Sequence, residues 1–348
     1  MENHVLFEKK GSVALITLNR PKKLNALNRE MIDEILSLLR RCEEDRQVKL
    51  IFLEGSGDRA FSAGGDVMAV YDMCLNGKVE EAVDAFRAEY EMDYYLSDYS
   101  KPVISYMDGI TMGGGVGISI GTDFRIVTEN TRWAMPEMKI GLFPDVGVSY
   151  YTSKMEDGFG MYLSLTSKTV GADDCVFLGV ADYKVDSSDY PALKEEILDF
   201  SWEKLNRNEV TATVDDIIRD YSREAEKGYL EENRDDIRTY FDKEDLNEII
   251  ASLQADTDKP FAQKALESIG KNSPTSMAVT LEQLNRAKHM YLKECFEQDL
   301  VMVKSFLRNK DFFEGVKNKL IDKTDRVEWT PKDLSLLKKS VVESYFEE

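Results

Sequence analysis

The chain has 348 residues, of which 43% are hydrophobic and 32% charged, a composition typical of a globular protein of about two domains. A formal net charge of −20 argues against a general role on nucleic acid or on a membrane surface, so any anionic ligand would need a local basic patch. The four cysteines are scattered without a CxxC pair, which indicates neither a zinc site nor a disulfide framework.

Strand and helix signals alternate over the first 200 residues. Strands are predicted at 13–19, 49–57 and 102–109, and helices from near Asn28 and over about 77–98. This alternation is typical of βαβ units around a parallel sheet, so an α/β fold is expected.

The chain changes character near residue 200 and is almost entirely helical beyond it. Ser273, Pro274 and Thr275 supply the start of one such helix, which continues with an apolar stripe. The acidic stretch 213–247 is interpreted as a solvated helical face, with a partner-binding surface as the alternative.

Histidine is scarce, and neither copy has partners for a catalytic triad or a metal site. His4 lies near the N-terminus and His289 in a charged stretch that is expected to be helical. Acid–base chemistry is therefore expected to fall to carboxylates, tyrosines, lysines or water. No apolar run approaches the ~18 residues needed to span a membrane, and neither terminus carries a recognisable targeting signal. These observations favour a cytoplasmic protein, with a processed mitochondrial form as the alternative.

Two glycine clusters follow predicted strands: FSAGGD, at 61–66, and MGGGVG, at 112–117. Small residues let backbone N–H groups approach a ligand and point at an anion, although a glycine pair alone is more often a plain turn. A dinucleotide site would need glycine where the chain has Ile118, and no GxxxxGK[ST] phosphate-binding motif occurs. The second cluster is better explained as a helix N-terminus whose N–H groups face a developing oxyanion.

The stretch AMPEMKIGLFPDVG, at 134–147, places two carboxylates in apolar surroundings. Apolar side chains flank Glu137, and desolvation of this kind raises a carboxyl pKa toward the range of a general acid or base. Asp145 follows eight residues later, beside Pro144. Spacing alone also allows a structural interpretation, in which Glu137 caps a turn and Asp145 begins a helix.

The chain resembles the crotonase (enoyl-CoA hydratase/isomerase) superfamily in FSAGGD, KPVISYMDGITMGGGVGISIG and FRIVTENTRWAMPEMKIGLFPDVGVSYY. More narrowly, it resembles the 3-hydroxyisobutyryl-CoA hydrolase branch, and the likeness covers most of the chain apart from about 195–265. The resemblance implies a spiral of ββα turns, with a crotonase-like catalytic core at 1–200 and a helical C-terminal region at 201–348. It also allows a homo-oligomer, because members of the superfamily often assemble as trimers or hexamers.

The resemblance implies an acyl-CoA substrate. It places two backbone N–H donors of an oxyanion hole at Gly65 and Gly114, and removing a donor of this type costs about 2.7–4 kcal/mol. Glu89, in RAEYEMD, would line the substrate pocket, and Ala63 and Asp66 would contact the substrate beside Gly65.

Hydratases of the superfamily use two glutamates, but this chain has only Glu137 and carries Gly117 at the other position. It has Asp145 in addition, as the hydrolase branch does. The resemblance therefore implies hydrolysis of 3-hydroxyisobutyryl-CoA in valine degradation, with no metal or redox cofactor. Glu137 would attack the thioester or activate water, and Asp145 would orient the 3-hydroxyl group or the water. The alternatives are an enoyl-CoA hydratase or isomerase that uses Glu137 alone, and a noncatalytic acyl-CoA-binding protein.

A local basic patch for CoA is expected in NRPKKLNALN, at 19–28. Lys22 lies there, next to the LNAL turn that lines the CoA site in the family. An ordinary solvated turn explains an exposed lysine equally well.

Overall fold

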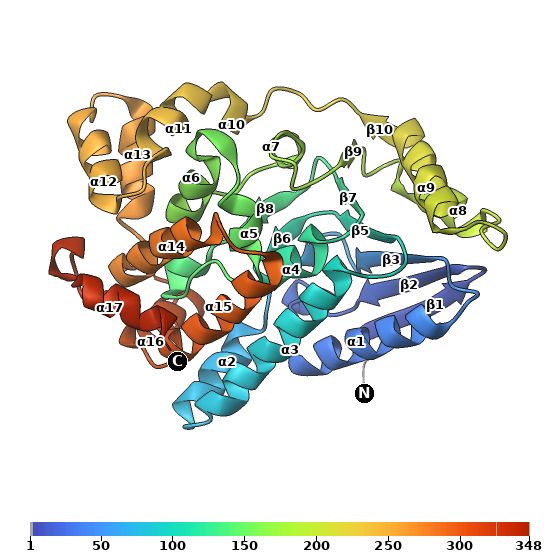
Figure 1. Ribbon diagram of the computed structural model, residues 1–348, viewed down its shortest axis with the longest axis horizontal. Coiled ribbons are helices and arrows are strands. Elements are labelled where there is room, and N and C mark those ends of the chain that lie inside the picture. The colour runs from blue at the N-terminus through green and yellow to red at the C-terminus, as the bar shows by residue number, and fades with distance from the viewer. Residues whose placement is uncertain (1–2, 325, 348) are drawn as a thin grey trace. The chain divides into compact units, whose positions relative to one another are not determined.

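The computed structural model describes residues 3–324 and 326–347. The chain divides into two compact units, each assembled from separated stretches. Figure 1 labels the helices and strands and colours the chain by residue number. The unit termed here the sheet unit comprises Met1–Gly65, Ala88–Trp133 and Val170–Glu231. The helical unit comprises Asp66–Arg87, Ala134–Thr169 and Glu232–Glu348. The division at residue 200 stays a prediction from the sequence.

Within the described residues, the sheet unit contains a seven-stranded sheet of order β1-β2-β3-β5-β7-β9-β10 and a three-stranded sheet of order β4-β6-β8. In the larger sheet the strands from β2 to β9 pair in parallel, and β1 and β10 pair antiparallel at its edges. The strands are β1 (Val5–Lys10), β2 (Val13–Leu18), β3 (Leu50–Gly55), β4 (Ala60–Ser62), β5 (Val103–Met107), β6 (Ile110–Met112), β7 (Phe124–Val127), β8 (Arg132–Ala134), β9 (Tyr183–Val185) and β10 (Ser222–Arg223).

From β3 to β9, consecutive strands alternate between the two sheets. β3 is followed by β4, β5 by β6 and β7 by β8, and the first strand of each pair belongs to the larger sheet. The pair β5 and β6 leads directly into the helix α4 (Gly114–Ile120). This succession of ββα turns is a mixed α/β fold, and it confirms the predicted fold class.

The first helix, α1 (Arg29–Glu44), shows why the local predictions succeed. The side-chain oxygen of Asn28 accepts a hydrogen bond of 3.0 Å from the backbone N–H of Met31, which caps the helix where its start was predicted. The buried face of α1 packs against β1 and β2. The strands predicted around residues 13, 49 and 102 are β2, β3 and β5, each within two residues of the predicted ends.

The other helices and helical turns of the sheet unit include two that join the apolar core of the larger sheet, α8 and α9. Trp202, between them, is fully buried and donates its indole N–H to the carbonyl of Ile197 at 2.8 Å. These elements are η1 (Pro21–Lys23), α7 (Ala172–Phe177), α8 (Tyr190–Asp199), α9 (Arg207–Tyr221) and α10 (Tyr229–Glu232).

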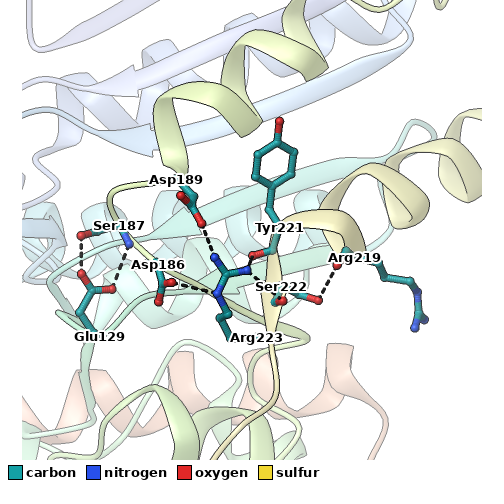
Figure 2. A network of polar contacts seen from close by, with 8 residues as sticks. All are labelled: Glu129, Asp186, Ser187, Asp189, Arg219, Tyr221, Ser222 and Arg223. Carbon is teal, nitrogen blue, oxygen red and sulfur yellow. Dashed lines mark hydrogen bonds and ion pairs between the residues drawn. The ribbon is translucent and has the colours of Figure 1, made fainter.

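Figure 2 shows how ion pairs hold the edge strand β10. Arg223 pairs with Asp186 at 2.9 Å and with Asp189 at 2.5 Å. Glu129 accepts a hydrogen bond of 3.0 Å from the backbone N–H of Ser187 in the same connection. Exposed pairs of this kind contribute about 0–1 kcal/mol each, so they order the connection rather than drive folding.

Helices dominate the helical unit. α14 begins as predicted, with Pro274 as its first residue and Ser273 as its cap, which accepts from the N–H of Ser276 at 3.2 Å. The helix ends at Ala287, so His289 lies exposed in the following turn and not in a helix as expected. The elements are α2 (Val67–Leu75), α3 (Val79–Ser97, which continues into the sheet unit), η2 (Glu137–Ile140), α5 (Val148–Thr152), η3 (Glu156–Gly158), α6 (Phe159–Thr166), α11 (Arg234–Phe241), α12 (Leu246–Ala255), α13 (Pro260–Ile269), α14 (Pro274–Ala287), α15 (Leu292–Phe306), α16 (Lys310–Val316), η4 (Lys317–Ile321), η5 (Leu334–Leu336), α17 (Lys339–Glu343) and η6 (Ser344–Phe346).

Candidate active site

The turn around Gly65 is held by the LNAL turn that precedes α1. The N–H of Ala63 donates to the carbonyl of Leu24 at 2.9 Å. The fully buried side chain of Asn25 donates to the carbonyl of Ala60 at 2.8 Å. The two loops that the resemblance places at the substrate are therefore joined by hydrogen bonds.

Gly65 and Gly114 lie next to each other in the sheet unit. Gly114 is the first residue of α4, and a methyl group on its α-carbon would stand 3.2 Å from the backbone nitrogen of Gly65. The preceding residues, Gly64 and Gly113, have φ angles of 103° and 51°, in a region that side chains disfavour. The structure thus brings together the two residues predicted to form the oxyanion hole, and the close approach of the Gly65 backbone explains the glycine at 114.

Glu89 reaches the same place from α3. Its side chain is 6% exposed, and its Oε2 lies 3.5 Å from the position that a methyl group on Gly65 would occupy. A methyl group on Gly114 would overlap its Oε1. The carboxylate therefore lies against both glycines, where the resemblance expects a residue of the substrate pocket.

Glu137 lies in the helical unit and opens the short 3-10 helix η2. Its side chain is 8% exposed, and the neighbouring Met135 and Met138 are buried as well. Its backbone carbonyl also accepts a hydrogen bond from the N–H of Leu142 at 3.0 Å. Glu137 therefore has the buried carboxylate expected of a catalytic group. Its backbone also stabilises a turn, as the structural interpretation of the sequence expected.

Asp145 is 7% exposed and lies in the turn before α5. Its carbonyl accepts the N–H of Val148 at 3.1 Å, and α5 begins only at that residue, so Asp145 precedes the helix and does not start it. Val146 and Gly147, in between, have φ angles of 54° and 68°. The carboxylate is therefore carried by a sharp turn.

Two fully buried residues of the helical unit contact this turn. Neither was predicted from the sequence. Asp299 accepts a hydrogen bond from the N–H of Gly147 at 2.8 Å, and Gln283 donates its side-chain amide to the carbonyl of Pro144 at 3.0 Å. Burial, and next the nearby Asp145, raise the pKa of Asp299 well above its usual value, while the hydrogen bonds from Gly147 and Gln283 act in the opposite direction.

Helical periodicity could have pointed to Asp299. Its neighbours at helical spacing are Cys295, Met302 and Val303, all buried. A carboxylate within the apolar stripe of a helix is rare unless it is paired, so its position in the sequence EQDLVMVK is a usable signal.

The remaining predicted site residues have simpler surroundings. Lys22 is exposed on η1. Asp66 caps α2, because its Oδ1 accepts from the N–H of Ala69 at 3.3 Å, so it has a structural role whatever else it contacts. Over residues 3–324 and 326–347, no group of three or more His, Cys, Asp or Glu side chains is placed to hold a metal ion. Over the same residues, no helix has both the length and the apolar character needed to cross a bilayer.

Comparison with known proteins identifies the class. Residues 13–346 match the enoyl-CoA hydratase/isomerase family, and the chain belongs to this family. This confirms the crotonase resemblance.

Individual relatives are similar over nearly their whole length. The chain is 37% identical to a mitochondrial 3-hydroxyisobutyryl-CoA hydrolase of Gallus gallus, over 98% of this chain and 88% of the relative. It is also 37% identical to a probable 3-hydroxyisobutyryl-CoA hydrolase of Arabidopsis thaliana, over 99% of this chain and 92% of the relative. Among solved structures, a carnitinyl-CoA dehydratase from Mycobacterium thermoresistibile superposes with a TM-score of 0.92 at 32% identity, covering 100% of this chain and 97% of the other.

Proposed function

We propose that the protein hydrolyses the thioester of 3-hydroxyisobutyryl-CoA to 3-hydroxyisobutyrate and CoA, a step of valine degradation. The observation that carries the proposal is the similarity over nearly the whole chain to relatives named for this reaction. Two sequence features support it: Asp145 is present, and Gly117 stands where hydratases hold a second glutamate.

In the proposed reaction the thioester oxygen accepts hydrogen bonds from the N–H groups of Gly65 and Gly114 while the carbonyl carbon is attacked. Attack by the Glu137 carboxylate expels the CoA thiolate, which takes up a proton, and leaves a mixed anhydride. Water hydrolyses the anhydride, which releases the hydroxy acid and restores Glu137. As a general base, Glu137 would instead take a proton from the attacking water, and the tetrahedral intermediate would collapse to the same products.

Asp145 is proposed to orient the 3-hydroxyl group or the attacking water, and Glu89 to contact the substrate beside the two glycines. A buried carboxylate that accepts a hydrogen bond from the substrate's hydroxyl group favours hydroxylated substrates. A substrate without a hydroxyl group binds less well, because it does not supply that hydrogen bond. Lys22 is proposed to contact a phosphate of CoA, and Ala63 and Asp66 to border the substrate. The scheme uses no metal or redox cofactor.

A dehydratase or hydratase activity is the second candidate, because the superposed Mycobacterium structure is named a carnitinyl-CoA dehydratase. This reaction would add or remove water on the acyl chain and leave the thioester intact. In that case Glu137 would act without a second glutamate.

One assay separates these activities. The protein is incubated with 3-hydroxyisobutyryl-CoA, 3-hydroxypropionyl-CoA and crotonyl-CoA, while free thiol and the enoyl absorbance are followed. We expect thiol from the hydroxyacyl esters and an unchanged enoyl absorbance. Hydration of crotonyl-CoA without thiol release would favour the second candidate, and binding of all three esters without turnover would indicate a noncatalytic protein.

The two routes to the products differ in one covalent step. Hydroxylamine added during a single turnover captures a mixed anhydride as a hydroxamate on the peptide that carries Glu137, which mass spectrometry detects. The general-base route leaves that peptide unmodified.

The compartment and the assembly state complete the proposal. The Gallus gallus relative is named as mitochondrial, which supports the mitochondrial alternative, whereas no comparison supports the cytoplasm. Fractionation of the source cells tests the compartment. A homo-oligomer is proposed because members of the superfamily often assemble as trimers or hexamers. Light scattering of the purified protein tests this proposal.

A further inference from the structure

The turn that carries Asp145 has a conformation that needs external support. Val146 has a φ of 54°, which is rare for a β-branched side chain, and Gly147 continues in the same region with a φ of 68°. A methyl group on Gly147 would stand 2.8 Å from the ring of Phe296, so this position accepts only glycine without rearrangement. Strained residues of this kind persist only where the surrounding structure fixes them.

Two side chains fix the turn on both sides of Asp145. The Oδ2 of Asp299, on α15, accepts from the N–H of Gly147 at 2.8 Å. The Nε2 of Gln283, on α14, donates to the carbonyl of Pro144 at 3.0 Å. Both helices belong to the helical unit and are labelled in Figure 1.

The two side chains also bind each other. The Nε2 of Gln283 donates to the Oδ1 of Asp299 at 2.8 Å, so one amide group serves two acceptors and one carboxyl group uses both oxygens. Neither residue is exposed to solvent. Buried hydrogen-bonded networks of this type hold their members in one arrangement, because each lost bond leaves a buried polar group unsatisfied.

The electrostatic surroundings agree with this arrangement. Burial and the nearby Asp145 carboxylate raise the pKa of Asp299. The carboxylate of Asp145 is therefore near enough to influence the charge of Asp299.

We infer that Asp299 and Gln283 are positioning residues that hold the Pro144–Gly147 turn, and with it Asp145, in the geometry required for catalysis. The inference rests on the proposed function for the role of Asp145. Small displacements of a catalytic group lower the rate by up to about 100-fold, so the support of this turn has a measurable effect.

The test combines activity with hydrogen exchange. Asp299→Asn keeps the shape of the side chain but replaces one oxygen by a donor, which opposes either the N–H of Gly147 or the amide of Gln283. Gln283→Met keeps the length of the other side chain and removes both donors, and it serves if the first variant does not fold. Val303→Ala, a buried change one helical turn from Asp299 that removes no hydrogen-bonding group, is the control.

We expect Asp299→Asn and Gln283→Met to lower kcat by about 10- to 100-fold, with KM little changed. In an Asp145→Asn background the same changes should have less than about twofold effect, because the turn then carries no functional carboxylate to position. Val303→Ala should leave kcat unchanged in both backgrounds. Equal losses of kcat with and without Asp145 would overturn the inference, since they would indicate a general structural effect.

Hydrogen exchange followed by mass spectrometry gives a readout that needs no turnover. The peptide covering residues 142–149 should exchange faster in Asp299→Asn and Gln283→Met than in wild type or Val303→Ala. Unchanged exchange in both variants would overturn the inference. If the wild type releases no thiol, the proposed function fails, and the exchange data still decide whether these two residues hold the turn.

Discussion

The carboxylate of Glu89 lies against the α-carbon of Gly114, so closely that a side chain on Gly114 would overlap its Oε1. The backbone nitrogen of Gly65 lies 3.2 Å from the position that a β-carbon on Gly114 would occupy. Three residues from separate stretches of the chain thus surround one point, and only glycine leaves that point open.

Gly114→Ala tests this arrangement. The added methyl group must displace Glu89 or tilt the amide of residue 114, so we expect kcat to fall by about 10²–10³-fold, as for loss of one oxyanion donor. The control is Gly171→Ala, where a methyl group meets nothing within 4 Å and φ is −97°. The control should retain its kcat, and a Gly114→Ala enzyme as active as the control would contradict the proposed role of the amide.

Glu137→Gln tests the proposed nucleophile or base. The amide has nearly the same shape but neither attacks the thioester nor accepts a proton from water, so thiol release should fall by about 10²–10⁴-fold or more. Binding of the CoA ester, followed by calorimetry, should be largely retained. Glu156→Gln, an exposed glutamate of the helical unit, is the matched control. Turnover close to that of the control would remove Glu137 from the mechanism.

Asp299 predicts a pH dependence of stability. Its pKa is raised in the folded chain, first by burial and next by Asp145, whereas the unfolded chain has the usual value of about 3.9. The folded chain therefore keeps this proton where the unfolded chain has lost it. The stabilising contribution is complete below about pH 4 and is lost as the pH rises through the folded pKa.

Asparagine at this position carries no such proton. The difference in free energy of unfolding between the wild type and Asp299→Asn should therefore move in favour of the variant as the pH rises from about 4. Urea denaturation of both proteins over a series of pH values measures this difference. A difference independent of pH would show that Asp299 does not titrate as described.

Lys22→Met tests the proposed contact with CoA. An exposed ion pair contributes about 0.2–1 kcal/mol, so we expect KM to rise by up to about fivefold at low salt with kcat unchanged. The effect should shrink as ionic strength increases, because salt screens exposed charges. Lys204→Met removes another exposed lysine of the sheet unit and should leave KM unchanged. Equal behaviour of the two variants would mean that Lys22 lies in an ordinary solvated turn.

The sequence predicted those features whose physical signal is local. The start of a helix near Asn28 and the alternation of strands and helices require only neighbouring residues, and both were confirmed. The proximity of Gly65 and Gly114 was expected because each lies in a glycine motif that follows a predicted strand. The family resemblance assigned both motifs to one oxyanion hole.

Other features depend on residues far apart in the chain. Asp299 and Gly147 are separated by 152 positions, and Gln283 and Pro144 by 139. No local pattern pairs such residues, although a carboxylate in an apolar stripe marks one of them. The two compact units were not visible in the composition either, because each combines stretches from distant parts of the sequence.

The discontinuity of the units affects how the chain folds during synthesis. The segments 66–87 and 134–169 leave the ribosome long before the stretch 232–348 that completes their unit. Until then Phe143, which is buried in the finished protein, lacks Phe306, the residue of α15 on which its ring stacks. The nascent chain therefore passes through a period of exposed apolar surface, in which chaperone binding competes with aggregation. The sheet unit is complete once residue 231 has emerged, so it is positioned to fold first.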